Sequence, residues 1–342
     1  MKRYVLTIWV SVVLVVLIYT AGAEADPILS PWQFKDNMEL PGHAFGSAVA
    51  GGKIYAIGGN APGENYGTNH VQKYDPPSDT WSLAASMPTA RHSLDCAVVD
   101  GYIYAIGGHV GNSRSENERY DPSTNTWQPM ASKPTSVSDL GVAALGGRIY
   151  TFGGNHYGSH QSVIEMYDPQ TNTWQSVGNM PAAGQPGEAA TMGSKIYLVG
   201  GHFPAEGGTA GHLWAYDPVS GTWDTSLPNM NQPRVFHELV VVGDYLFAIG
   251  GANSSGILSS VEWWTPGATT WTFDESLNVA RCQFGAEAVG STVYSFGGYL
   301  AGNLSSTESA TLIPAPGAVV LGGIGLSCSS WLLRRRGFVD SL

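Results

Sequence analysis

The hexapeptide IYAIGG occupies residues 54–59, and the same six residues return at 103–108. Four related stretches, IYTFGG, IYLVGG, LFAIGG and VYSFGG, follow along the chain. The six glycine pairs are Gly58-Gly59, Gly107-Gly108, Gly153-Gly154, Gly200-Gly201, Gly250-Gly251 and Gly297-Gly298, at spacings of 49, 46, 47, 50 and 47 residues. A fixed period of this length indicates a stacked or circular architecture, so the sequence predicts six repeated units.

A second motif follows each of the first five glycine pairs. It reads YDPPSDTW at 74–81, YDPSTNTW at 120–127, YDPQTNTW at 167–174, YDPVSGTW at 216–223 and WTPGATTW at 264–271. Asp-Pro followed by Ser, Thr, Asn or Gly favours a turn between two strands, because proline presets φ and Asp and Asn bond their own backbone. Each unit is therefore predicted to hold four short strands. The repeats lack the long 3.6-residue apolar period of a helix, which makes the predicted class all-β.

A double glycine, then a tyrosine, then a tryptophan at this spacing resembles the kelch repeat. The resemblance covers about residues 25 to 312, and five of the six units carry the whole pattern. Kelch units are the blades of a β-propeller, so the resemblance implies a six-bladed kelch-type β-propeller, which we place at residues 24–312.

The two ends of the repeat region complement each other. ADPILSPW at 25–32 has the Asp-to-Trp spacing of the internal motif, with Ala25 in place of tyrosine. The last unit has its glycines and a third-strand candidate, SSTESATL at 305–312, but no Asp-Pro or tryptophan after it. We therefore expect the N-terminal strand around Trp32 to complete the last blade, which closes the ring and removes exposed sheet edges.

The N-terminus has the pattern of an export signal. MKRY is followed by an apolar stretch at 5–20 and by the small-residue sequence AGAEA at 21–25. A positive segment, an apolar segment and small residues in this order are typical of a signal peptide, which we place at residues 1–23 with cleavage after Ala23 or Ala25. The alternative is a membrane anchor that is not cleaved.

The C-terminal segment, residues 313–342, carries a second targeting pattern. Pro314, Ala315 and Pro316 precede an apolar stretch at 318–333 and the cluster Arg334, Arg335 and Arg336. This order resembles the PEP-CTERM sorting signal, although Ala315 replaces the central glutamate. The resemblance implies processing by an exosortase-type sorting protease, transient anchoring in the inner membrane and a final place at the bacterial cell surface or outside the cell. The alternative is an ordinary tail anchor, whose arginines would stay cytoplasmic.

Charge narrows the range of partners. The chain has 16 basic and 27 acidic residues, and loss of residues 1–23 and of those after Pro316 would leave a net charge of about −15. Such a domain repels nucleic acid and other anionic polymers, whereas neutral or cationic partners are compatible with it. No residue spacing suggests a metal site, no cofactor is expected, and Cys96 and Cys282 are interpreted as buried thiols.

Candidate binding residues come from aligning the repeats. Strand direction alternates along a blade, so the connection into each first strand and the loop after each glycine pair should share one face. Sixteen residues before the first glycine of each pair, the six positions are Gly42, Arg91, Val137, Gly184, Arg234 and Arg281. Four places further on, three of the equivalent residues are Asp95, Glu188 and Glu238. The ligand-binding candidates are His43, Arg91, His92, Glu188, Arg234, His237, Glu238 and Arg281.

Two interpretations of these residues remain open. In one, the three arginines gather at a channel mouth and contact a sugar or peptide, with Tyr66, Tyr157 or Phe203 stacking on it. In the other, the arginines brace blades by bonding carbonyls and carboxylates, and the loop histidines are solvated. The long loops at 60–70, 109–115, 155–162 and 202–212 lie on the same expected face, and loops on a rigid scaffold are where binding usually occurs.

The sequence thus predicts an exported, surface-associated propeller that acts as a non-catalytic protein- or carbohydrate-binding module, with no catalytic residue assigned. The alternative is a carbohydrate-modifying enzyme similar to the sialic-acid epimerases, in which Glu188 or Glu238 would act beside the three arginines. A structural component of the envelope or biofilm matrix is the third possibility. Fold alone does not separate the three.

Overall fold

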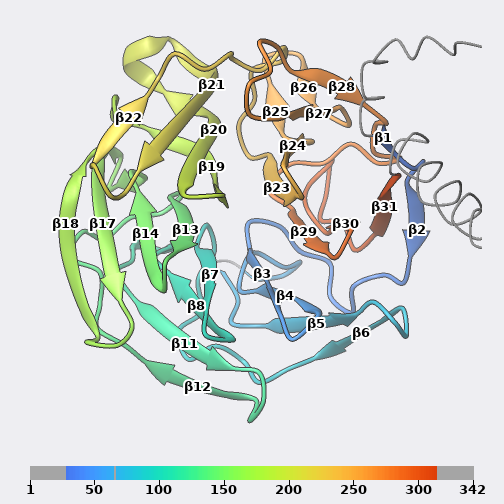
Figure 1. Ribbon diagram of the computed structural model, residues 1–342. Helices are drawn as coiled ribbons and strands as arrows, with labels where there is room; N and C mark the ends of the chain where they lie inside the picture. Colours follow the sequence, from blue (N-terminus) through green and yellow to red (C-terminus); the bar gives the residue numbers. More distant parts are fainter. Residues whose placement is uncertain (1–27, 65–66, 314–342) are drawn as a thin grey trace, which may run out of the picture. The chain divides into compact units, whose positions relative to one another are not determined.

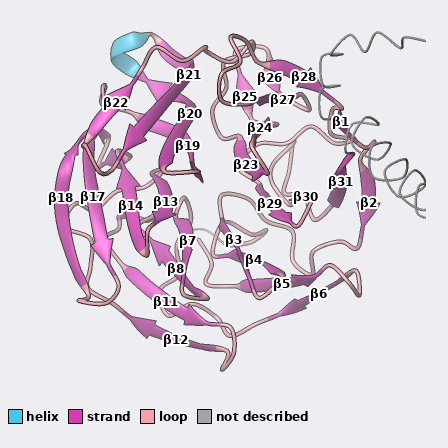
Figure 2. Cartoon of the chain, viewed as in Figure 1, coloured by secondary structure: helices cyan, strands magenta, loops and turns pink. Residues whose placement is uncertain are grey.

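The computed structural model describes residues 28–64 and 67–313, and the predicted signal peptide and C-terminal sorting segment lie outside these residues. Leu29–Ile313 form one compact unit, a ring of six antiparallel sheets (Figure 1). Apart from one turn of 3₁₀ helix, η1 (Pro204–Glu206), the regular structure described is strand (Figure 2). The predicted all-β six-bladed propeller is confirmed. No helix among the described residues has the length and apolar character needed to cross a membrane.

Blades 1 to 5 each contain four strands in sequence order from the channel outward. The strands of blade 1 are β3 (Gly46–Ala50), β4 (Lys53–Ile57), β5 (Val71–Asp75) and β6 (Thr80–Leu83). Those of blade 2 are β7 (Asp95–Val99), β8 (Tyr102–Ile106), β11 (Asn117–Asp121) and β12 (Thr126–Pro129). Those of blade 3 are β13 (Gly141–Leu145), β14 (Arg148–Phe152), β17 (Val163–Asp168) and β18 (Thr173–Asn179).

Blade 4 contains β19 (Gln185–Met192), β20 (Lys195–Phe203), β21 (Gly208–Asp217) and β22 (Thr222–Asp224). Blade 5 contains β23 (Glu238–Val242), β24 (Tyr245–Ile249), β27 (Val261–Trp264) and β28 (Thr272–Asp274). Blade 6 contains β29 (Gly285–Val289), β30 (Thr292–Phe296) and β31 (Thr307–Ile313), with β2 (Gln33–Lys35) and β1 (Ile28–Leu29) outside. Two-residue hairpins extend three loops: β9 (His109–Val110) with β10 (Asn112–Ser113), β15 (Asn155–His156) with β16 (Ser159–His160), and β25 (Ala252–Asn253) with β26 (Gly256–Ile257).

The N-terminal strand closes the ring, as the sequence predicts. In the register of β2 on β31, Gln33 lies opposite Ser309 and Lys35 lies opposite Thr307. The Trp32 indole N–H donates to the carbonyl of Glu275, 3.0 Å away in the segment that follows blade 5. The equivalent tryptophans make the same bond at the end of the preceding blade or just after it: Trp127, Trp174, Trp223 and Trp271. Trp32 therefore occupies the fourth-strand position of blade 6.

The turn motif joins blades as well as strands. The Tyr120 hydroxyl donates to Asn125 Oδ1 (2.7 Å), and the same oxygen accepts the amide N–H of Ala85 from the preceding blade (2.8 Å). Tyr167 and Asn172 repeat the arrangement with Ala131. A typical intramolecular hydrogen bond contributes about 1 kcal/mol net, so the motif stabilises the seams that blades 2 and 3 make with the preceding blade.

The glycine pairs make the second contact between blades. The amide N–H of Gly59 donates to the carbonyl of Arg91 in the connection to blade 2 (2.9 Å), and Gly298 of blade 6 donates to Gly42 ahead of blade 1 (2.8 Å). Gly59 has φ +92°, a left-handed conformation that side chains disfavour. A Cβ there would lie 2.7 Å from the carbonyl oxygen of His43. The double glycine is thus required by backbone angle and by close approach.

We expect Gly59→Ala to lower the free energy of unfolding by about 3 kcal/mol, because it combines left-handed strain with overpacking. Gly51 is the matched control, since it has φ +59° but a Cβ added there would meet no heavy atom within 4 Å. Gly51→Ala should therefore lose only about 1 kcal/mol. Urea denaturation of the two variants checks this, and equal losses would contradict the steric explanation.

Candidate functional site

The loops of one face of the ring form the candidate site. Isolated bridges join His43 to Asn60, His92 to His109 and Ser138 to Asn155, so each connection into a first strand lies beside the loop that follows a glycine pair. This confirms that the two sets of segments share one face, which we call the loop face.

Six equivalent residues encircle the channel mouth on the loop face, and we call them the collar. They are Ala44, Ser93, Asp139, Pro186, Phe236 and Gln283. Their backbones are linked from blade to blade: Gln283 N–H donates to Phe236 (3.0 Å), Ala44 to Gln283 (2.7 Å), Ser93 to Ala44 (2.7 Å) and Asp139 to Ser93 (3.0 Å). All collar residues except Pro186 have φ between +50° and +55°.

The collar is interrupted at blade 4. Proline has no amide N–H, so Pro186 cannot donate to Asp139 as Ala44, Ser93, Asp139 and Gln283 donate to their neighbours. Pro186 is instead part of β19, where Gln185 lies opposite His202 of β20. Blade 4 therefore presents three long antiparallel strands, β19, β20 and β21, at the point where the collar is open.

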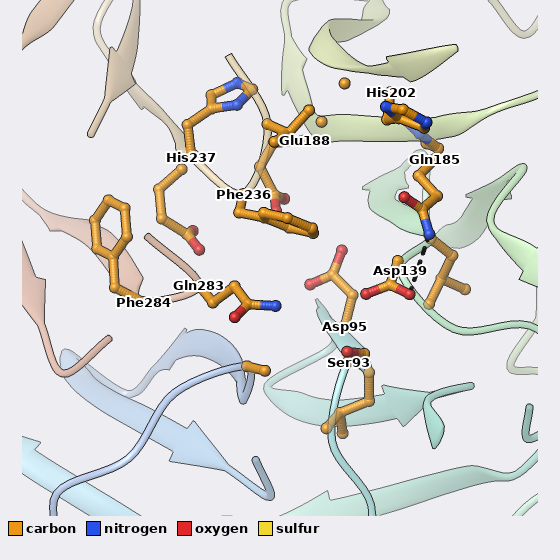
Figure 3. A pocket seen from close by; sticks show the side chains of 18 of the residues that line it. Ser93, Asp95, Asp139, Gln185, Glu188, His202, Phe236, His237, Gln283 and Phe284 are labelled. Carbon is orange, nitrogen blue, oxygen red and sulfur yellow. Dashed lines mark hydrogen bonds between the residues drawn. The ribbon is translucent and has the colours of Figure 1, made fainter. Parts of the chain in front are cut away.

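A pocket lies inside the collar, and a cavity of about 200 Å³ continues from it into the channel. Figure 3 shows Asp95, Glu188, Gln283 and Phe236 turned toward the same central space. The Phe236 side chain is 39% exposed. The pocket thus combines an aromatic surface with carboxyl and amide groups, a composition suited to orienting a ligand.

Four carboxyl groups from first strands line the channel, and we call them the channel acids. They are Asp95, Glu188, Glu238 and Glu287. Asp95 accepts the amide N–H groups of Cys96 (2.6 Å) and Val142 (2.9 Å), and Glu287 accepts the Ser47 hydroxyl (2.8 Å). Asp95 thereby connects β7 to β13, and Glu287 connects β29 to β3.

Burial inside the channel raises the pKa values of the channel acids. Burial raises the pKa of Asp95 to about 7, with the charge of Glu287 adding to the effect. Burial likewise raises the pKa of Glu287 to about 7. The pKa values of Glu188 and Glu238 also lie well above the usual range, through burial first and then repulsion from the other acids. Groups with raised pKa values of this kind can exchange protons near neutral pH.

The three arginines do not line this pocket. Arg91, Arg234 and Arg281 have no exposed surface. Each is paired with a glutamate on the third strand of its own blade: Arg91 with Glu118 (2.5 Å), Arg234 with Glu262 (2.7 Å) and Arg281 with Glu308 (2.7 Å). Their backbone carbonyls accept an N–H from the glycine pair of the preceding blade. The arginines therefore act as braces, because protein groups accept hydrogen bonds from each buried guanidinium, although the Nε of Arg91 has no such partner.

Blades without this arginine use other contacts at the same seam. In blade 3, where the position is Val137, the ammonium of Lys133 pairs with Glu165. In blade 1, Gln72 exchanges two hydrogen bonds with the backbone of Leu40 (2.8 and 2.9 Å). The partner glutamates were missed in the sequence, although those of blades 2, 3 and 5 each lie two residues before a motif tyrosine or tryptophan, on the strand that the motif ends.

Of the predicted binding residues, Glu188, His237 and Glu238 line the pocket, and His43 and His92 lie outside its lining. The His43 ring is 2.8 Å from Asn303 Oδ1, and burial lowers the pKa values of both His43 and His92. His237 is fully buried beside Arg234, and burial lowers its pKa to about 3. Its neutral ring packs on the backbone of Gly187 and Gly200.

Among the three predicted stacking residues, Tyr66 lies outside the described residues. Tyr157 is 63% exposed at a hairpin tip, and Phe203 is buried in blade 4. Cys96 and Cys282 are both buried free thiols. The structure instead brings forward Phe236, Asp139 and Gln283, which the sequence analysis did not single out. Their shared position, two residues after the aligned arginine position, is the signal that could have found them.

The fold and its repeated seams define a kelch-type propeller. The family model of the KLHDC2/KLHL20/DRC7 Kelch-repeats domain matches residues 42–251, more than half of the chain, and the Kelch motif matches residues 233–278. The chain belongs to the kelch-repeat family.

Individual relatives share only part of their length with this chain. Kelch-like protein 7 of Rattus norvegicus is 37% identical over 84 residues, which are 25% of this chain and 14% of that protein. Beta-scruin of Limulus polyphemus is 33% identical over 104 residues, 30% of this chain and 10% of that protein. The solved structure of YjhT superimposes with a TM-score of 0.68 over 81% of this chain and 99% of its own, at 17% identity, which shows the shared fold alone.

Proposed function

We propose that the protein is an exported, surface-associated kelch propeller that binds a protein partner through the pocket inside the collar. Kelch propellers commonly serve as protein-binding modules. The export component is supported by the signal-like residues 1–23 and by the sorting pattern in residues 313–342. The exosortase-type protease and the inner membrane would then be transient partners during processing.

Phe236 is the observation that carries the choice of site. It has φ +54°, a conformation that is rare for a bulky residue, and its ring is 39% exposed. Glycine would satisfy the same backbone angle without steric cost. Residues held in such conformations cluster at ligand sites, where the surrounding structure maintains them. An exposed, strained aromatic ring beside a polar pocket therefore supports a role in contacting a ligand.

The epimerase-like alternative receives less support from the geometry. It needs arginines at the channel mouth to hold the carboxylate of its substrate, whereas Arg91, Arg234 and Arg281 are buried in ion pairs. The channel acids offer proton exchange, but no lysine or arginine stands among the described residues that line the pocket and the channel. A binding site uses the pocket as it stands, so the non-catalytic module is the better supported function. A carbohydrate ligand remains a distinguishable outcome of the experiment below.

The test is an array of peptides and glycans probed with the full chain and with Phe236→Gly. We expect the variant to weaken binding about 30-fold, because an aromatic contact at the centre of an interface commonly contributes about 2 kcal/mol. Its stability should stay within about 1 kcal/mol of the parent, since glycine relieves the backbone strain.

Phe273→Gly is the matched control, because Phe273 is 55% exposed on β28, an outer strand far along the blade from the collar. It should leave binding unchanged. Hits confined to glycans would favour the carbohydrate-binding form of the proposal. If the ligands bound Phe236→Gly as tightly as the parent protein, or if no ligand bound at all, the pocket would not be the binding site.

A further inference from the structure

We infer that the group entering the channel mouth is a cation, namely the lysine or arginine side chain of a protein partner. This inference rests on the proposed function, since it assumes that the pocket inside the collar is the binding site. It adds the charge and shape of the group that the site selects.

The charge of the lining is one-sided. The pocket and the channel cavity are lined by five carboxyl side chains: Asp95, Asp139, Glu188, Glu238 and Glu287. Among the residues that the structure describes, no lysine or arginine belongs to either lining. Once Asp95 and Glu287 ionise above about pH 7, walls of one charge sign concentrate the field inside the cleft and attract ligands of the opposite sign.

The nearby cations are already neutralised. Arg91 donates to Glu118 and to the carbonyl of Ala105 (2.9 Å). Arg234 donates to Glu262 and to the carbonyls of Gly250 (2.8 Å) and Ser260 (2.9 Å). Each guanidinium pairs with a glutamate that lies outside the lining. Among the described residues that line the channel, no arginine or lysine is left to pair with the channel acids.

The mouth of the pocket also suits a cation on a flexible chain. Phe236 presents an exposed ring, and a cation over an aromatic face gains about 0.5–1 kcal/mol at an exposed site and more when water is excluded. Figure 3 shows the Gln283 amide and the Asp95 and Glu188 carboxyl groups around the space beside this ring. The cavity of about 200 Å³ beneath gives room for one extended side chain. The methylene part of lysine or arginine would lie along Phe236 while its charged end reaches the acids.

Proton release accompanies binding in this arrangement. The ionisable groups facing the site come from every side of the ring. They are Asp95 and Cys96 on β7, Glu188 on β19, Glu238 on β23, Glu287 on β29, Asp139 and His237 in the connections, and His202 on β20. Ser47 on β3 is bonded to Glu287. Burial keeps Asp95 and Glu287 protonated up to about pH 7, and an incoming cation stabilises their ionised form. Binding therefore expels a proton, and affinity should rise with pH.

The experiment compares two capped tripeptides, acetyl-Gly-Lys-Gly-amide and its norleucine counterpart, by calorimetry on the full chain. We expect the lysine peptide to bind at least tenfold more tightly at pH 8, and its affinity to fall about tenfold at pH 6 as one proton is retained. Glu188→Gln and Glu238→Gln should each reduce the preference for lysine about tenfold without loss of folding, because each removes a carboxyl repelled by its neighbours. Asp244→Asn, an exposed acid in the turn after β23, is the charge-matched control and should change nothing.

The outcomes separate the two levels of the proposal. Equal binding of the lysine and norleucine peptides, or a lysine preference that survives Glu188→Gln and Glu238→Gln, would overturn the cationic inference. Array ligands that depend on Phe236 but lack positive charge would overturn it too, while leaving the proposed function in place. If no ligand on the array depended on Phe236 for binding, the proposed function itself would be overturned.

Discussion

Arg281→Met is expected to lower the free energy of unfolding by about 4 kcal/mol. The guanidinium of Arg281 donates to the Gly297 carbonyl (2.9 Å) and to Glu308 Oε1 (2.7 Å), and both side chains of the ion pair are fully buried. Removing one partner leaves a buried carboxylate uncompensated, which is the damaging way to break such a pair. Urea denaturation measures the loss.

Two controls give this prediction its meaning. Lys53→Met breaks an ion pair of similar length, 2.6 Å to Asp75, whose side chains are about one third exposed, so it should lose less than about 1 kcal/mol. The double variant Arg281→Met/Glu308→Gln removes both charges and should recover part of the stability. If Arg281→Met and Lys53→Met behave alike, the arginine is not a brace.

The channel acids are expected to lower the stability as the pH rises from about 4 to beyond 7, whereas the lowered pKa values of His43, His92 and His237 act in the opposite direction below about pH 6.5. Asp95 and Glu287 hold their protons up to about pH 7 in the folded protein, whereas in the unfolded chain they release them near pH 4. Unfolding in this window therefore releases protons, and a higher pH favours the unfolded state. Each unit of pKa difference between the folded and unfolded states corresponds to about 1.4 kcal/mol. After allowance for solvent in the channel, each of these two acids should lower the free energy of unfolding by on the order of 2 kcal/mol across this window.

Melting temperatures at pH 5 and pH 8 check this dependence. Glu287→Gln removes one of the titrating groups and should raise the stability at pH 8 while flattening the pH profile. Asp244→Asn serves here as well, because this exposed acid lies outside the channel. A difference in stability between pH 5 and pH 8 that Glu287→Gln leaves unchanged would rule out this acid as a source of the pH dependence.

The fold could be predicted because its determinants are local and repeated. Each glycine pair and each Tyr-Asp-Pro turn meets a backbone requirement that recurs in one blade after another. Trp32 could be placed because it has the same spacing from an Asp-Pro as the internal tryptophans. The spacing even identified the set of residues whose carbonyls meet the glycine N–H groups, from Gly42 to Arg281. Periodicity therefore carries the architecture.

The site was only partly predictable, because the same alignment cannot say which way a side chain points. Arg234 and Phe236 are two residues apart, yet one turns inward to Glu262 and the other is exposed at the pocket. The left-handed φ of Phe236 separates the two directions, and no sequence pattern indicates it for a phenylalanine. Glu188 and Glu238 were found because their first-strand position alone determines that they face the channel.

Closure of the ring sets the order in which the protein can be completed during synthesis. Ser30 and Thr311 bond in both directions, the amide N–H of Ser30 to the Thr311 carbonyl (2.9 Å) and the amide N–H of Thr311 to Ser30 Oγ (3.0 Å), across 281 residues of chain. Such a distant contact forms only after the intervening chain is in place, because closing a long loop costs entropy before the contact can stabilise the fold. A polypeptide stopped before β31 would offer Trp32 no blade to join and would keep two open edges. Completion of the fold thus reports that the repeats have been synthesised to the end, and incomplete products remain prone to aggregation and open to proteases.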